Sequence, residues 1–234
     1  MSHYRAADAL LSRGVLQKRG KPGQTSSPVG QQLHRHATEL AMLALDSVAV
    51  AYSNHWDPIH AKCVVEAFPN MYLAALVHEC DFPPLARDAS DRYWEILVER
   101  SDRLVALISH LLPGRQLITE LNKVRNHEHR AGVVCALTAL SVVMADYVSV
   151  GDTEDGHIIL PPQTMWGSGT QECGTWLEPV LRSNLHAVRR ARQAHANHRH
   201  ARIATNAGCW GESAVAAQQA AAPDDRMMRV SGRG

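Results

Sequence analysis

The sequence predicts a mixed fold in which helices alternate with short strands. Lys62–Phe68 (KCVVEAF) is short and Val-rich and is stopped by Pro69-Asn70, which is typical of a strand. Asp91–Leu112 instead carries apolar residues at helical spacing. A further short strand is expected at the end of Val150–Pro162 (VGDTEDGHIILPP), after an acidic turn. Elements of both kinds share one chain, which favours an α/β class.

The composition is that of an ordinary globular protein. The 234 residues are 45% hydrophobic and 20% charged, and the net charge of +1 gives no global field that favours nucleic acid. The five cysteines are odd in number and never spaced as CxxC, which favours a reducing, cytoplasmic location over a disulfide framework. No signal peptide opens the chain, and no apolar run approaches the about 18 residues of a membrane span.

Further elements are expected from local patterns. Ser101-Asp102 marks a break within Asp91–Leu112 and a new helix start. Ser47–Tyr52 is either a strand or the end of the helix before it. Short helices are expected at Tyr4–Val15, Gln31–Leu45, Met71–Val77 and Leu117–Val124.

The central stretch, Asn126–Pro162, combines a polar cluster with an apolar helix. Almost every residue from Gly132 to Val143 is apolar or small, which predicts a helix buried on all sides. The cluster His127 to Arg130 opens this helix. Either it delivers side chains and backbone donors to a site, or it caps the helix and forms a solvated loop.

Two acids from distant segments are candidate metal ligands. Glu66 lies in the Val-rich strand, where it either points to water at an edge or is held in a site, and Glu128 lies at the mouth of the central helix. Carboxylates from different elements suit Mg²⁺, which prefers oxygen ligands. Two such ions, roughly 3.5–4 Å apart, can activate water and stabilise the leaving oxygen in phosphodiester cleavage.

Common catalytic motifs are absent from the sequence. It contains no P-loop, GxGxxG, HExxH or GxSxG pattern, and a Ser/His/Asp triad has no local signature. The pairs His127-x-His129 and His198-x-His200 lack the organised cysteines of structural zinc sites.

The C-terminal part carries the one basic stripe of the chain. No acid lies between Glu178 and Glu212, and Trp176–Ala204 reads as one long helix or two. Its arginines could lie along a phosphate backbone, although the stripe lacks interleaved aromatic residues, and a solvated helix or mobile tail is the alternative. The candidate phosphate contacts are Arg182, Arg189, Arg190 and Arg192. Residues 213–234 are expected to be disordered.

Three motifs together resemble a known family. They are VVEAFP (Val64–Pro69), HEHRAGVVCALTAL (His127–Leu140) and VGDTEDGHIILPP, and in combination they are similar to the RNase H-like predicted nuclease family catalogued as domain of unknown function 429. The segment RAAD (Arg5–Asp8) matches an Arg-x-x-Asp element of that family. The resemblance covers about residues 5–166.

The resemblance implies an α/β domain with an RNase H-like mixed sheet flanked by helices, N-terminally truncated and followed by a helical C-terminal extension. The expected parts are an N-terminal helix and loop (1–30), an RNase H-like core (31–166) and a basic helical extension with a disordered tail (167–234). The truncation is expected because no strand carries the leading aspartate of the fold. The sheet edge left without that strand favours a homo-oligomer.

Residue by residue, the resemblance makes Glu66 the middle-strand acid and Glu128 the last-helix acid, both catalytic metal ligands. His127 would orient water or contact phosphate. The implied function is an Mg²⁺- or Mn²⁺-dependent nuclease acting on DNA or RNA. Because two carboxylates make a weak Mg²⁺ site, the alternative is a non-catalytic RNase H-like remnant that binds nucleic acid or a protein partner. A small-molecule phosphoryl enzyme, the third reading, has no Gly-rich phosphate loop to support it.

Overall fold

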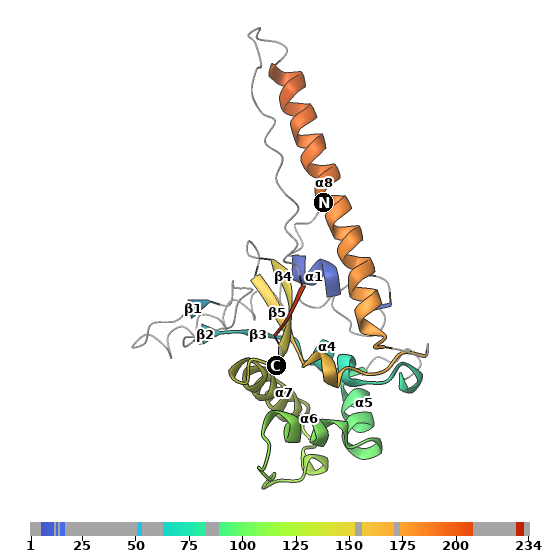
Figure 1. Cartoon of the computed structure of the whole chain (residues 1–234), viewed down its shortest axis with the longest axis vertical. Helices are drawn as coiled ribbons and strands as arrows, with labels where there is room; N and C mark the ends of the chain where they lie inside the picture. Colours follow the sequence, from blue (N-terminus) through green and yellow to red (C-terminus); the bar gives the residue numbers. More distant parts are fainter. Residues whose placement is uncertain are drawn as a thin grey trace.

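Helices surround a small mixed sheet in the computed structural model (Figure 1). The structure describes residues 6–11, 13, 15–16, 51–52, 63–82, 89–152, 156–170, 174–207 and 228–231. The α-helices are α1 (Ala6–Leu11), α4 (Pro69–Leu76), α5 (Ala89–Glu95), α6 (Arg103–Leu111), α7 (His127–Val143) and α8 (Leu177–Ala207). Short turns are the 3₁₀ helices η2 (Glu79–Asp81), η4 (Leu121–Lys123) and η5 (Gln163–Met165) and the π-helix η3 (Ile96–Arg100).

The main sheet has the strand order β3-β5-β4-β6. Its strands are β3 (Glu66–Ala67), β4 (Tyr147–Asp152), β5 (Gly156–Leu160) and β6 (Met228–Ser231). β3 runs parallel to β5, whereas β4 is antiparallel to both β5 and β6. A separate parallel pair joins β1 (Ala51–Tyr52) to β2 (Cys63–Val64). The mixed α/β class is confirmed, and the RNase H-like topology stays a prediction.

The strand β6 corrects the expectation that residues 213–234 are disordered. Met228–Ser231 pairs with β4, with Val230 opposite Val148. The expectation was wrong for these four residues because polarity and low hydrophobicity describe a segment in isolation. An open strand edge offers backbone donors and acceptors that such a segment can satisfy.

Both faces of the sheet are buried, and successive side chains of a strand point alternately to the two faces. Val148, Val150, Ile158 and Leu160 belong to the main core. Neighbouring positions point the other way: Tyr147 and Ile159 form a smaller cluster with Val142 of α7. The sheet is therefore packed against helices rather than exposed on one side.

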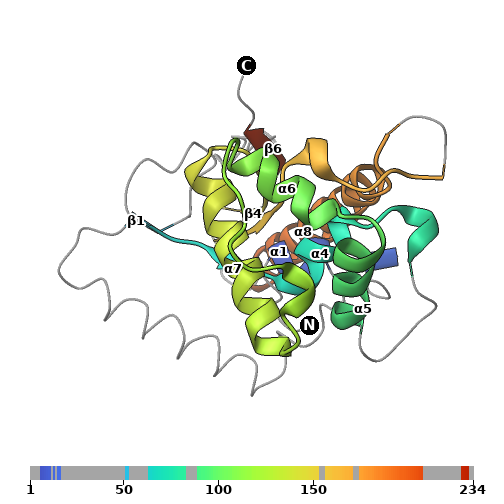
Figure 2. The same ribbon diagram turned by 90° about the horizontal axis from the view of Figure 1, so that it is seen from below.

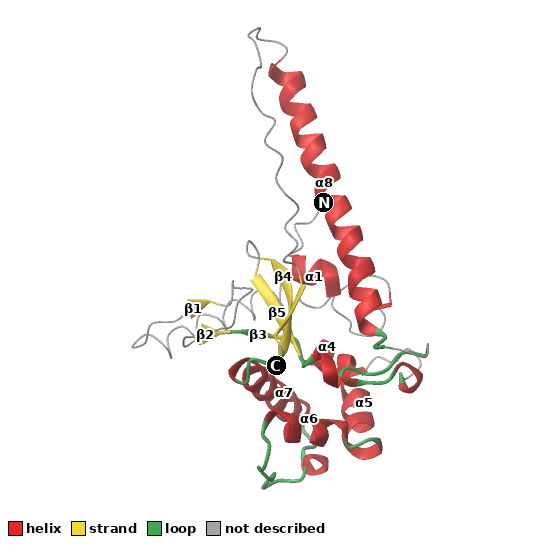
Figure 3. Cartoon of the chain, in the orientation of Figure 1, coloured by secondary structure: helices red, strands yellow, loops and turns green. Residues whose placement is uncertain are grey.

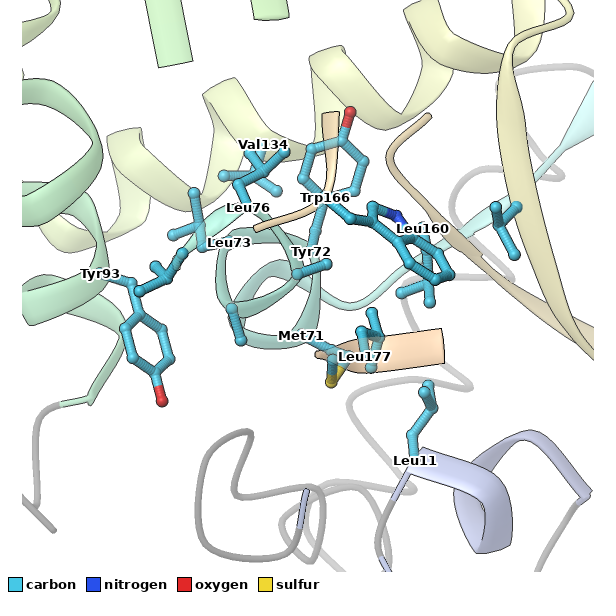
Figure 4. Packing of buried hydrophobic residues seen from close by; sticks show 14 of the residues in the cluster. Leu11, Met71, Tyr72, Leu73, Leu76, Tyr93, Val134, Leu160, Trp166 and Leu177 are labelled. Atoms are coloured by element: carbon cyan, nitrogen blue, oxygen red, sulfur yellow. The ribbon is translucent and has the colours of Figure 1, made fainter. Parts of the chain in front are cut away.

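The main core is organised around α4 (Figure 4). Every residue from Met71 to Val77 is at most 2% exposed. Trp94 from α5 and Leu11 from α1 join the same core, as does Leu177 at the start of α8. The division at residues 30 and 166 stays a prediction, but packing already crosses it, because α1 and the first turns of α8 share a core with the central segment.

Two helix predictions are confirmed. Ser101-Asp102 separates the π-helical turn η3 from α6, and the Asp102 backbone there is left-handed, with a φ of 50°. The segment after Trp176 forms the single helix α8, which extends away from the sheet (Figure 3). No described helix is both long and apolar enough to cross a membrane. The predicted helix Gln31–Leu45 lies outside the described residues.

The prediction that α7 is buried on all sides was wrong. Val134, Leu137 and Val142 face the protein, but Val143 is 76% exposed. The small residues Gly132, Cys135, Ala136 and Ala139 are exposed as well. Such residues count as apolar in a sequence pattern, yet each exposes little apolar surface, so an uncharged face can still meet solvent.

Candidate functional site

The N-terminus of α7 is capped by a side chain. Asn126 has an extended backbone, and its Oδ1 accepts hydrogen bonds from the backbone N–H groups of Glu128 (2.8 Å) and His129 (3.2 Å). These bonds satisfy donors that a helix start leaves without intrahelical partners. The polar cluster predicted from the sequence therefore includes a cap, and His127, Glu128 and His129 are exposed beside it.

Two side chains of α7 converge on one carboxylate of α5. The Nδ1 atom of His127 lies 3.2 Å from Oδ1 of Asp91, and Nη1 of Arg130 donates to the same oxygen at 2.9 Å. His127 and Arg130 are three residues apart, so they lie on one face of the helix. The donors share Oδ1, which leaves Oδ2 of Asp91 without a hydrogen bond within the described part of the chain.

The pKa of Asp91 reflects this geometry. Partial burial acts to raise the pKa of the carboxyl group, but the hydrogen bonds from His127 and Arg130 and their charges act in the opposite direction and prevail. The pKa of Asp91 is therefore lowered from its ordinary value of 3.8. At neutral pH the group is an anion that can only accept, so the Nδ1 atom of His127 carries a proton. The Nε2 atom of His127 makes no hydrogen bond within the described part of the chain.

Arg130 is fixed from three sides. Besides its bond to Asp91, its Nε donates to the carbonyl oxygen of Val124 at 2.9 Å. Its guanidinium also lies over the ring of Trp94, 5.6 Å from the centroid. The side chain is only 13% exposed. Arg130 is thus a rigid positive group, whereas His127 is 57% exposed and accessible.

A pocket of about 190 Å³ lies beside this triad. Three helix starts, those of α4, α5 and α7, contribute to its wall (Figure 2 shows these helices from below). The apolar part of the wall comes from Phe68, Leu73, Ala131 and Val134. The polar part consists of Asn70, Asp91, His127 and Arg130. The pocket thus offers an apolar wall and a charged side within one small cavity.

The two predicted metal ligands are not part of the wall of this pocket. Glu66 lies on the edge strand β3, half-buried and opposite Ile158. It precedes the lining residue Phe68 by two positions, and the exposed Glu128 follows the lining residue His127. Over the described ranges, no group of three or more His, Cys, Asp and Glu side chains could hold a metal ion.

Asp91 is the residue that sequence reasoning missed. Its one sequence signal is an acid in the first turn of a helix. Ordinary stabilisation of a helix N-terminus explains such an acid equally well. Its partners lie 36 and 39 residues further along the chain, and no local pattern connects them.

A second polar cluster contains a serine–histidine pair. The Oγ of Ser168 lies 2.6 Å from Nδ1 of His78, and Nη1 of Arg103 lies 2.7 Å from Nε2 of the same ring. Burial lowers the pKa of His78, as does the charge of Arg103, against a smaller opposite effect of Asp81. In a catalytic triad, the histidine nitrogen that does not face the serine donates to a carboxylate. Here that nitrogen faces Arg103, which can only donate, so the cluster is not a catalytic triad. Arg103 also donates to the carbonyl oxygen of Met165 at 2.8 Å, so the cluster ties α6 to the segment after β5.

The arginines predicted to contact phosphate lie on α8 but do not form a single line. The buried positions of this helix include Leu181 and Val188. At about 100° per residue, Arg182, Arg189, Arg190 and Arg192 fan out over about 160° of the helix surface. Arg182 donates to Glu178 at 2.6 Å, one turn earlier. Arg190 and Arg192 are exposed.

A comparison of the chain with protein-family models, with curated proteins and with solved structures found no match. The resemblance to the RNase H-like predicted nuclease family therefore stays a prediction, and the site is interpreted from its own geometry.

Proposed function

We propose that this protein binds nucleic acid through the pocket at which α4, α5 and α7 begin. The observation that carries the proposal is the convergence of His127 and Arg130 on Asp91 beside a small apolar cavity. Since Nδ1 of His127 is directed at Asp91, a phosphate group would accept from Nε2 of this ring in its imidazolium form, and it would be attracted by the guanidinium of Arg130. A base or sugar can fill an apolar cavity next to those donors.

The size of the cavity supports a single ring-sized group rather than a large ligand. Pockets that enclose a drug-sized molecule usually measure about 300–1,000 Å³, and this one measures about 190 Å³. A base held in a duplex cannot enter such a cavity without leaving its stack, whereas a base of a single strand can. The proposed ligand is therefore single-stranded.

The test measures the anisotropy of a fluorescein-labelled single-stranded oligonucleotide, as DNA and as RNA, mixed with the full chain. We expect His127→Ala to weaken binding by roughly tenfold, which corresponds to about 1.4 kcal/mol. This is close to the size of one hydrogen bond to a charged group. Binding should also weaken as salt rises, because phosphate contacts release counterions.

The matched control is His129→Ala. His129 is exposed on the same helix but does not line the pocket, so this variant should bind like the parent. Equal affinity of the parent and His127→Ala, or equal weakening by both variants, would contradict the proposal.

A metal-dependent nuclease is the second candidate, and one observation favours it. Glu66 and Glu128 lie within two positions of Phe68 and His127, which line the pocket, and this closeness in the sequence supports placing both acids beside the bound phosphate. In this case Mg²⁺ or Mn²⁺ would supply the activated water. We expect Glu66→Gln and Glu128→Gln each to abolish Mn²⁺-dependent cleavage of a labelled oligonucleotide while the circular dichroism spectrum stays unchanged. Equal cleavage by the parent and both variants would exclude this role for the two acids.

The basic face of α8 is a separate proposed contact. Figure 1 shows that α8 extends away from the sheet, on the side opposite α7. Arg190 and Arg192 do not line the pocket, and we propose that they contact only a long strand. Replacing these two residues by Gln should lower the salt dependence of binding to a long strand and leave binding of a short oligonucleotide unchanged. Loss of short-oligonucleotide binding would show that α8, and not the pocket, holds the ligand.

We also propose a cytoplasmic location and edge-to-edge association of two copies. Cys80 and Cys135 are free thiols, which supports a reducing compartment. β3 is an edge strand of the described sheet, which supports association through strand pairing. Sedimentation velocity of the full chain tests the second proposal, since a monomer at all concentrations would contradict it.

A further inference from the structure

A second pocket is lined by residues of α5 other than the one that lines the first pocket. It measures about 400 Å³, within the about 300–1,000 Å³ typical of sites for small molecules. Its walls are the turn η2 with the following Phe82, and the continuous segment formed by α5, η3 and Ser101. It shares no lining residue with the pocket at the start of α7. The proposed nucleic-acid site does not use it.

Charges of both signs line this pocket without neutralising each other. Arg92, Glu95 and Arg100 come from one helical segment, and Asp81 comes from η2. Arg92 and Arg100 are exposed, and Glu95 is half-buried. Within the part of the chain that the structure describes, Arg92, Glu95 and Arg100 form no ion pair. Two cations and two anions therefore line one cavity, and of these Arg92, Glu95 and Arg100 have charges available to a ligand, while Asp81 also accepts from the Cys80 thiol.

The apolar part of the wall is held rigidly. The ring of Phe82 meets those of Tyr93 and Trp176 edge to face, at centroid distances of 5.6 Å and 4.9 Å. Ile96, at the start of η3, is 6% exposed. The hydroxyl of Ser101 donates to the carbonyl oxygen of Ile96 at 2.8 Å and fixes the π-helical turn. Such turns are rare and are often found at functional sites.

The lining of this pocket suits a zwitterionic ligand, one that carries both a positive and a negative charge, with an apolar side chain. A lone anion would meet Glu95 and Asp81, and a lone cation would meet Arg92 and Arg100, so a ligand of one charge is opposed by half of the lining charges. A ligand that carries a carboxylate and an ammonium group satisfies both sets. We propose that this pocket binds a free α-amino acid with a large apolar side chain, whose carboxylate pairs with arginine, whose ammonium pairs with Glu95 or Asp81, and whose side chain contacts Phe82 and Ile96.

The experiment is isothermal titration of the full chain with L-leucine and L-phenylalanine. Two half-ligands test the zwitterion requirement: 4-methylpentanoate has the carboxylate and the leucine side chain, and 3-methylbutylamine has the ammonium and the same side chain. We expect at least one amino acid to bind and both half-ligands to bind at least tenfold more weakly. No binding of either amino acid, or binding of one half-ligand as tight as that of leucine, would overturn the proposal.

Variants then locate the site. Arg100→Gln and Glu95→Gln should each weaken amino-acid binding at least tenfold. Glu99→Gln is the matched control, because Glu99 is exposed in the same π-helical turn and does not line the pocket. His127→Ala should leave amino-acid binding unchanged, since the two pockets are separate. Binding that survives both Arg100→Gln and Glu95→Gln, in variants with the circular dichroism spectrum of the parent, would place the ligand elsewhere and refute the proposal.

Discussion

At the scale of single residues, the charge of Asp91 links the site to stability. Its pKa is lower in the folded protein than its ordinary value of 3.8, so the folded state binds this proton less readily than the unfolded state. The stabilisation is therefore complete well above that pH and is lost as the pH falls through the lowered pKa. Because the side chain is 40% exposed, solvent screens its partners and the effect is modest.

We expect Asp91→Asn to reduce the loss of stability in the pH window that runs from above the ordinary value of 3.8 down through the lowered pKa of this carboxyl group. The measurement is the midpoint of urea unfolding across this window. Glu99→Gln, which removes an exposed carboxylate, is the control and should keep the pH dependence of the parent. If Asp91→Asn kept the pH dependence of the parent, the pKa of Asp91 would be the same in the folded and unfolded states, which would contradict the prediction.

Two glycines give opposite predictions for the same substitution. A Cβ added to Gly167 would lie 1.8 Å from the carbonyl oxygen of Val77, so Gly167→Ala must displace the backbone at the end of α4. We expect it to lower the free energy of unfolding by more than about 2 kcal/mol. Gly132 is an exposed helical position with nothing within 4 Å of an added Cβ, and Gly132→Ala should stabilise by about 0.5–1 kcal/mol. Urea unfolding of both variants checks the pair, and a tolerated Gly167→Ala would contradict the close approach.

At the scale of the element, the start of α7 depends on Asn126. Its side chain accepts from two backbone N–H groups, which nothing else in the described helix start satisfies. Asn126→Ala should lower the free energy of unfolding by about 1 kcal/mol, within the usual range of about 0.5–2 kcal/mol for a lost cap. Asn126→Asp keeps an acceptor and should retain most of the stability. Thermal unfolding by circular dichroism distinguishes the two, and equal melting temperatures for Asn126→Ala and the parent would contradict the cap.

The same helix shows what a sequence pattern can and cannot establish. The helix itself was predictable, because Gly132 to Val143 contains no charge and no proline. Its environment was not. Val134 and Leu137 are buried while Val143 is 76% exposed, and a run that is apolar throughout has no periodicity to assign those faces. The candidate site follows the same rule: His127 stood out in the sequence, but its partner Asp91 did not.

At the scale of the whole molecule, the N-terminal helix α1 and the beginning of α8 are tied together. The Nδ2 of Asn184 on α8 donates to the carbonyl oxygens of Leu10 (2.8 Å) and Arg13 (3.2 Å). Leu181, one turn earlier on α8, is 1% exposed in the same core as α4. α1 and the first turns of α8 therefore belong to the cooperative unit that contains the central segment.

We expect Leu181→Ala to lower the free energy of unfolding by about 2–5 kcal/mol, as is usual for a buried leucine. Tryptophan fluorescence and far-ultraviolet circular dichroism should report one coincident transition, because Trp94 and Trp176 lie in the shared core. Arg190→Ala, at an exposed position of the same helix, should stay within about 0.5 kcal/mol of the parent. A separate helical transition in Leu181→Ala would show that α8 folds independently.

The sequence alone determined the break at Ser101-Asp102 and the long helix after Trp176, and it located extended chain before Pro69, although the structure divides the expected strand Lys62–Phe68 into β2 and β3 of two different sheets. These depend on backbone sterics and on side-chain spacing within a few residues, which a linear pattern records. Only the tertiary structure decided that Asp91 meets His127 and Arg130, that both faces of the sheet are buried, and that charges of both signs surround a second pocket. Such contacts join positions far apart in the chain, and packing selects them from many partners with the same local signal.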